Sequence, residues 1–289
     1  MPCKHQQYTA TTLSGPFVFA RPYKYDTSGL VQALEDSLNP SGDEFKSLRE
    51  DILYRIENHT DQTFLRKMDD DNPERLSLKS LDLIFARFNA YFFKNTLPQD
   101  TIIFRKAKNN ISILPGCCVS FKEASSLAVL AAATRIFHSS TREIDRIEPP
   151  CLFLPSKGTC SPNSSPGDDV SALLEAMIEL YLQWYSCCKP SCLESITACG
   201  KLGRGQAWQK IANLLERSEM MSDMQTLIGS QVRLRRYEGF VRELSWWDKP
   251  RSLISLDLLR ELGLVAWTVD DFVNAVEELN RKTLTSPRG

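Results

Sequence analysis

Histidine is scarce in this sequence, which contains only His5, His59 and His138 among its 289 residues. Histidine is the commonest metal ligand in proteins and the usual carrier of protons near neutral pH. Any site built from several clustered imidazoles would therefore have to use almost every histidine in the chain. The sequence does not favour such a site.

An excess of charge of one sign and a long apolar run are also missing. The chain has 35 Lys+Arg and 36 Asp+Glu, a formal net charge of −1, which argues against coating nucleic acid by bulk electrostatics but leaves a local basic patch open. No run approaches the roughly 20 apolar residues of a membrane span, and residues 1–20 lack a signal-peptide core. We therefore expect no membrane partner and an intracellular location, in the nucleus or the cytoplasm.

Cysteine is present in an odd number, nine, so disulfides within one chain cannot pair all of them. In a reducing compartment thiols usually stay reduced. Cys187, Cys188, Cys192 and Cys199 form a local group, but its C-C-x3-C-x6-C spacing differs from the paired C-x2-C motifs of structural zinc sites. We interpret these residues as reduced thiols near a loop, with a zinc knuckle as the alternative.

The hydrophobic fraction of 42% and the charged fraction of 25% are typical of a folded protein. The pattern divides the chain into a flexible arm (1–27), a helical extension (28–76), a central domain (77–218) and a mostly helical C-terminal appendage (219–289). Apolar patterns predict helices over 29–38, 43–56, 77–94, 168–185, 206–217, 253–262 and 269–282, and Ala and Leu content predicts one over 127–137. Strands are predicted over 101–105, 111–114, 118–121, 151–154 and 231–236, and a loop over 156–167.

The helix predicted over 168–185 is the most hydrophobic in the chain. Its apolar residues cover most of the circumference, as expected of a helix surrounded by other elements. We therefore expect it in the middle of the core, with four side chains fully buried: Leu174, Met177, Ile178 and Tyr181.

Three segments in order resemble the SprT-like (Spartan-type) zinc metalloproteases. Residues 173–182, L-L-E-A-M-I-E-L-Y-L, resemble the central helix of this family, L-L-H-E-M-I-H-A-Y-L. Residues 203–208, G-R-G-Q-A-W, resemble its G-H-G-x-x-F/W segment, and residues 83–98 resemble its opening L-F…F-N…F-F…L-P helix. The resemblance covers about 77–217. It implies an α+β fold with a zincin-like core, helices packed on a small sheet, flanked here by helical N- and C-terminal extensions.

The residues that carry the chemistry of this family are replaced. In a zincin, two His at i and i+4 bind zinc and the Glu between them activates the zinc-bound water. Here the two ligand positions are Glu175 and Glu179, the base position is Ala176, and the third ligand position is Arg204, which cannot give up its proton to bind metal. We therefore expect no catalytic residue, no metal ligand and no cofactor, although the resemblance implies zinc.

Three interpretations of the Glu175/Glu179 face remain. The favoured one brings Arg204 between both carboxylates, so that an ion cluster replaces the metal and relieves their like-charge repulsion. In the second, Glu175, Glu179 and Gln183 form the solvent-facing stripe of an amphipathic helix. In the third, the two carboxylates form a weak site for a hard cation.

The sequence thus predicts a SprT-like protein with a dismantled protease centre, which binds or scaffolds a protein partner. The alternatives are a divergent metalloprotease that uses Glu175 and Glu179, and an unrelated α-helical interaction protein. Binding of DNA is implied by the resemblance alone. The weak candidates for phosphate contacts are Arg233, Arg235 and Arg236, which can also be explained as outward residues of a strand. The weak candidates for base contacts are Trp246 and Trp247, which can also be explained as aromatics that pack the C-terminal segment onto the core.

Overall fold

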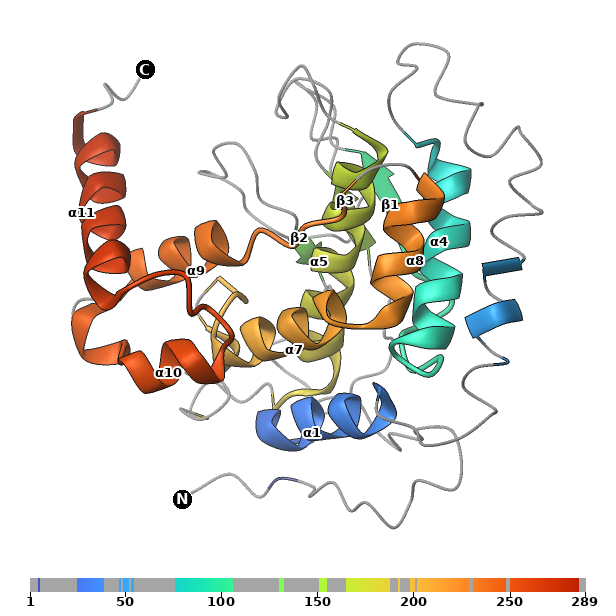
Figure 1. Ribbon diagram of the computed structural model, residues 1–289, viewed down its shortest axis with the longest axis horizontal. Coiled ribbons are helices and arrows are strands. Elements are labelled where there is room, and N and C mark those ends of the chain that lie inside the picture. The colour runs from blue at the N-terminus through green and yellow to red at the C-terminus, as the bar shows by residue number, and fades with distance from the viewer. Residues whose placement is uncertain are drawn as a thin grey trace, which may run out of the picture.

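The computed structural model describes residue 5 and residues 25–38, 47, 49–51, 53–54, 76–105, 130–132, 151–154, 165–187, 192, 198–200, 202–228, 231–247 and 250–285. Helices dominate these ranges, and one small sheet accompanies them (Figure 1). None of the described helices is long and apolar enough to cross a membrane. The elements are α1 (Thr27–Leu38), α4 (Leu78–Tyr91), β1 (Ile102–Arg105), β2 (Leu130–Ala132), β3 (Cys151–Leu154), α5 (Pro166–Tyr185), α7 (Gln206–Glu216), α8 (Glu219–Ile228), α9 (Arg236–Ser245), the 3-10 helix η2 (Pro250–Leu253), α10 (Leu256–Glu261) and α11 (Val269–Thr285).

Helix α5 lies at the centre of the molecule and contacts α1, α4, α7, α8 and the sheet (Figure 1). Every residue from Asp169 to Leu182 is buried, which confirms the predicted central position and the burial of its four named apolar side chains. The helix begins at Pro166, where a missing N–H costs nothing. Its first turn is closed by Asp168, whose carboxylate accepts the Ser165 N–H at 2.8 Å.

The sheet packs against α5 and has the order β1-β3-β2 within the described residues. Strand β3 pairs in parallel with β1, Ile102 opposite Cys151, and antiparallel with β2, Leu130 opposite Phe153. Strand β3 therefore lies between the other two. In the described part of the sheet, β2 forms an edge.

Helix α4 covers β1 and one side of α5. Ser77 caps it by accepting the N–H of Ser80 at 3.1 Å. The chain reverses direction after α4, between Tyr91 and Leu97. The buried side chain of Asn89, in the last turn of α4, fixes this reversal. Its amide donates to the Leu97 carbonyl at 2.9 Å, and its carbonyl oxygen accepts the Leu97 N–H at 3.1 Å.

The apolar side chains form two clusters. The main cluster runs from Tyr25 through α5, α7 and α8 to Leu234, and includes the three buried methionines of α8. The second cluster is formed by α9, η2, α10 and α11, with Phe272 fully buried at its centre. The two clusters divide between Leu234 and Phe240, later in the chain than the predicted start of the C-terminal appendage at residue 219.

Most predicted elements that fall within the described residues are confirmed, with ends shifted by a few residues. Helices α1, α4, α5, α7 and α11 and strands β1 and β3 lie where the sequence places them. The C-terminal helix predicted over 253–262 is shorter and follows a 3-10 turn, whereas α8 and α9 were not predicted. The strands predicted over 111–114 and 118–121 lie outside the described residues, as does most of the 43–56 helix.

Two predictions of secondary structure are wrong. The helix predicted over 127–137 rested on Ala and Leu content, but residues 130–132 form β2, because pairing with β3 outweighs a small helix propensity. The strand predicted over 231–236 is irregular up to Arg235, and α9 begins at Arg236. Val232 and Leu234 are buried and Arg233 is exposed, but Arg236, an outward residue of the predicted strand, is buried.

The Asn89 contacts predict a measurable loss of stability on truncation. Asn89→Ala should lower the free energy of unfolding by about 2–4 kcal/mol, because it leaves two buried backbone groups of Leu97 without partners. Urea denaturation measures the effect. Gln32→Ala is the matched control, because this amide lies exposed on α1 and bonds only Asp36 at 2.8 Å in that helix. Equal, small losses for both variants would show that Asn89 does not hold the reversal.

Candidate functional site

Glu175 and Glu179 lie one helical turn apart on the same face of α5, at the centre of the buried helix. Each residue is only 3% exposed. Two buried carboxylates at this separation repel each other and have lost their hydration, so they need a counter-charge. The chain supplies that charge from the turn that precedes α7.

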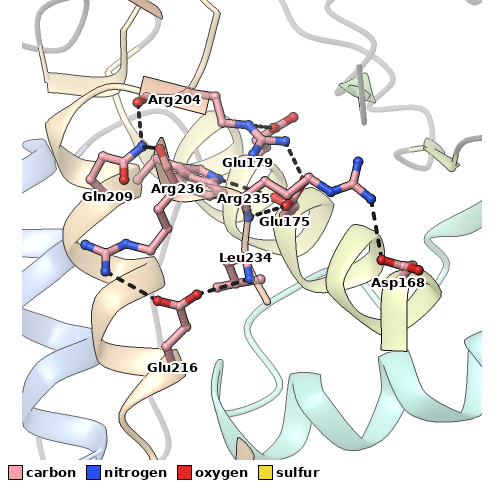
Figure 2. Close-up of polar contacts among 10 residues, drawn as sticks. Asp168, Glu175, Glu179, Arg204, Gln209, Glu216, Leu234, Arg235 and Arg236 are labelled. Atoms are coloured by element: carbon pink, nitrogen blue, oxygen red, sulfur yellow. Dashed lines mark hydrogen bonds and ion pairs between the residues drawn. The ribbon is translucent and has the colours of Figure 1, made fainter. Parts of the chain in front are cut away.

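Arg204 extends from this turn between the two carboxylates (Figure 2). Its Nε donates to Glu179 Oε1 at 2.7 Å, and one terminal nitrogen donates to Glu175 Oε2 at 2.9 Å. The guanidinium carbon lies 4.4 Å from the centre of the Trp208 ring, so the indole of α7 covers the cation. We name Glu175, Glu179 and Arg204 the ion cluster.

The backbone of the turn is shaped to bring Arg204 inward. Gly203 has a φ of 80°, a conformation that side chains disfavour. Gly205 has no room for a side chain, since a Cβ there would lie 2.6 Å from the Ala198 carbonyl. Glu243 of α9 completes the turn by accepting the N–H of Leu202 at 2.8 Å and that of Arg204 at 3.4 Å.

The segment that leads into α9 also contacts the ion cluster. The Arg235 N–H donates to Glu175 Oε1 at 2.8 Å, so both oxygens of this carboxylate are engaged. The neighbouring N–H groups of Arg233 and Leu234 donate to Ser171 Oγ at 2.9 Å and Glu216 Oε1 at 3.1 Å. Side chains of α5 and α7 thus accept the backbone hydrogen bonds that a neighbouring strand would otherwise accept. This explains why residues 231–235 form no strand.

The electrostatics of the site follow from this enclosure. Burial alone would lower the pKa of Arg204, but the charges and hydrogen bonds of Glu175 and Glu179 outweigh it and raise this pKa above its usual value. Arg204 is therefore a permanent cation. The pKa of Arg242 on α9 is lowered, first by burial and then by the positive charges of Arg204 and Arg235.

The predicted approach of Arg204 to both carboxylates is confirmed by these contacts. The alternative of a solvent-facing stripe is wrong, because both glutamates are buried and only Gln183 is half-buried. Ala176, at the general-base position of the resemblance, is fully buried and offers no group that could take a proton.

The weak binding candidates do not form one surface. Arg236 is buried and pairs with Glu216 at 3.3 Å, while Arg235 lies 3.7 Å from Asp168 (Figure 2). Arg233 is exposed. Trp247 is half-buried and its Nε1 donates to Glu243 Oε1 at 3.0 Å, whereas Trp246 is exposed. These contacts favour structural roles for three of the five residues: Arg235, Arg236 and Trp247.

Sequence reasoning missed several residues that support the site. Glu243 is 2% exposed and links the turn, α9 and Trp247, although nothing in its sequence context separates it from an ordinary helix glutamate. Gln209 is fully buried and its amide donates to the Arg204 carbonyl at 3.4 Å and the Arg236 carbonyl at 3.2 Å. The apolar residues beside Gln209 in α7 are the sequence feature that could have predicted its burial.

Zinc, which the resemblance implies, does not fit the donors at this position. Glu175 has both oxygens engaged, Glu179 binds the Arg204 guanidinium, and that cation lies where a divalent ion would need to sit. Two carboxylates that already share a buried arginine are a poor set for a borderline-soft metal. The arrangement can hold three chain segments together.

Comparisons with protein-family models, with curated proteins and with solved structures found no match to this chain. No relative therefore supports or contradicts the SprT-like resemblance. Inference about function has to start from the site itself.

Removal of the cation alone should be far more damaging than removal of the whole ion cluster. Arg204→Met leaves two buried carboxylates without a counter-charge and should lower the free energy of unfolding by about 3–5 kcal/mol. The deficit should shrink as the pH falls, because burial raises the pKa of an orphaned carboxyl and protonation then removes its charge. Adding Glu175→Gln and Glu179→Gln should restore most of the stability.

Urea denaturation across a pH series measures both effects. Arg260→Met is the matched control, since Arg260 pairs with Asp257 at 3.1 Å but is exposed on α10, and its loss should change stability little. If the triple variant were less stable than Arg204→Met at neutral pH, the three side chains would not act as one cluster.

Proposed function

We propose that this protein is a non-catalytic protein-binding module, built on a SprT-like scaffold whose zinc centre has been replaced by the ion cluster. The observation that carries the proposal is the position of the Arg204 guanidinium, 2.7 Å from Glu179 and 2.9 Å from Glu175. The resemblance assigns these three residues to the three zinc-ligand positions. Their convergence at one point is what a shared ancestral metal site requires.

The order of the elements supports a zincin-like core. Helix α4 opens the unit, β3 is the last described strand before the central helix α5, and α7 follows with Arg204 just before its first turn. The apolar positions of the opening pattern are buried, among them Phe88, Phe92 and Phe93. The Asn of the same pattern, Asn89, closes the reversal that ends at the L-P pair.

The chemistry of the site supports a role without catalysis. Hydrolysis of a peptide bond at a zinc centre needs a polarised water and a base that accepts its proton. Ala176 supplies no base, and the oxygens of Glu175 that could bind a metal are occupied by Arg204 and by the Arg235 N–H. The alternative of a protease that uses the glutamate pair therefore has little support.

The edge of the sheet supports binding of an extended protein segment. Among the described strands β2 stands at one end of the order β1-β3-β2, and an edge strand is the element to which an extended segment adds by main-chain pairing. Main-chain pairing of this kind requires no metal. A protein partner in extended form is therefore the occupant that this scaffold fits best.

One observation favours the second candidate, a helical interaction protein unrelated to the proteases. Large apolar side chains are exposed on the second cluster, namely Trp246, Leu256 and Val265 at 59%, 55% and 73% exposure. Such residues can mark a contact surface for a partner. In this case binding would depend on the C-terminal helices rather than on the sheet edge.

A combined cleavage and binding assay tests the proposal. The full-length protein, incubated with an unfolded fluorescent polypeptide and zinc, should cleave nothing, because the metal and the base act as a unit on one water and both are lost. The same polypeptide should bind saturably, as measured by fluorescence anisotropy. Ala131→Pro in β2 should abolish binding, while Trp246→Ala with Val265→Asp should leave it intact.

Two results would contradict this expectation. Chelator-sensitive cleavage by the wild type that disappears in Glu175→Ala, Glu179→Ala would establish the protease alternative. Binding that survives Ala131→Pro but is lost in the Trp246/Val265 variant would show that the C-terminal helices, and not the sheet edge, bind the polypeptide. Circular dichroism of each variant controls for unfolding.

A further inference from the structure

Three metal-ligating side chains meet beside the C-terminal end of α5, away from the ion cluster at its centre. Cys187 follows α5 by two residues, Cys192 lies five residues further along the chain, and His5 comes from the N-terminal segment. Their ligand atoms all lie within 4.8 Å of one another. The closest measured approach joins Cys192 Sγ and His5 Nε2 at 3.3 Å.

We propose that Cys187, Cys192 and His5 bind a zinc ion. Zinc binds thiolate sulfur at about 2.3 Å and imidazole nitrogen at about 2.0–2.1 Å, in a tetrahedral arrangement. These bond lengths place two sulfurs about 3.8 Å apart and a sulfur and a nitrogen about 3.5 Å apart. In the structure Cys192 Sγ and His5 Nε2 lie 3.3 Å apart and all three ligand atoms lie within 4.8 Å of one another, so one zinc ion can reach all three, and a fourth ligand would complete the tetrahedron. Two soft thiolates with one imidazole select zinc over the hard cations that prefer oxygen.

The surroundings of the two thiols suit a structural metal. Cys187 and Cys192 are both buried, and both are thiols rather than disulfide sulfurs. The backbone of Cys187 is fixed as well, since its N–H donates to the Tyr25 carbonyl at 3.1 Å and Tyr25 in turn donates to the Tyr185 carbonyl at 3.1 Å. Zinc here would tie the segment at His5 to the end of α5, next to this backbone contact.

The structure revises the interpretation of the cysteines made from the sequence. The sequence grouped Cys187, Cys188, Cys192 and Cys199, but a histidine remote in the chain takes part and Cys199 does not. Cys199 Sγ lies 3.6 Å from the hydroxyl of Ser186 and 4.0 Å from that of Thr27. Cys188 lies outside the described residues. Cys199 is therefore a matched control, close to the site but with other partners.

Metal analysis of the full-length protein tests the proposal. Protein purified with a phosphine reductant and without chelator should contain about one zinc per chain, as expected for a structural site. Cys187→Ser, Cys192→Ser and His5→Asn should each reduce the zinc content at least severalfold. Cys199→Ser should retain it, and so should the triple variant Arg204→Met, Glu175→Gln, Glu179→Gln, because the ion cluster is a separate site and this variant leaves no buried unpaired charge.

Cobalt spectroscopy of the wild type avoids the risk that a variant fails to fold. After exchange of zinc for Co²⁺, the folded protein should show a thiolate-to-cobalt charge-transfer band, and Cys199→Ser should show the same band. Wild-type protein that is folded but shows neither zinc nor this band would overturn the proposal. Zinc retained in Cys192→Ser, zinc lost in Cys199→Ser, or a Cys187–Cys192 disulfide found by mass spectrometry would do the same.

Discussion

The buried salt bridges of Arg204 with Glu175 and Glu179 are the interaction on which the arrangement of this protein depends. Removing these three charges from water is costly, and the cost is recovered only when every partner is in place. The partners come from α5, from the turn before α7 and from the segment before α9, whose Arg235 N–H completes the hydrogen bonds of Glu175. The ion cluster therefore couples the central helix to both later parts of the chain.

This coupling gives a physical reason for keeping three charged residues in the core. A metal centre cross-links the segments that supply its ligands, and an arginine between two carboxylates can do the same with hydrogen bonds. Trp208 covers the guanidinium and Glu243 anchors the turn that carries it, so water is largely kept from the cluster. On this account the scaffold keeps its shape, and with it a sheet edge that can bind an extended chain.

The sequence predicts the parts of the fold that depend on local pattern. Helix α5 could be predicted because its apolar residues cover most of its circumference, and the contact of Arg204 with the two glutamates followed from the family resemblance. The irregular segment 231–235 could not, because its inward Val232 and Leu234 alternate as in a strand while side chains from other elements satisfy its backbone. His5 reaches Cys187 and Cys192 only through tertiary folding, so the spacing of these residues in the sequence does not predict their contact.

Introducing the ligands that the resemblance implies tests the central claim most directly. The variant Glu175→His, Ala176→Glu, Glu179→His, Arg204→His places three imidazoles and a base where the resemblance assigns them. If the ion cluster occupies a former zinc site, this variant should bind one zinc ion more than the wild type, measured by metal analysis of both folded proteins. A folded variant that gains no zinc would contradict the claim that these residues occupy the positions of a dismantled metal centre.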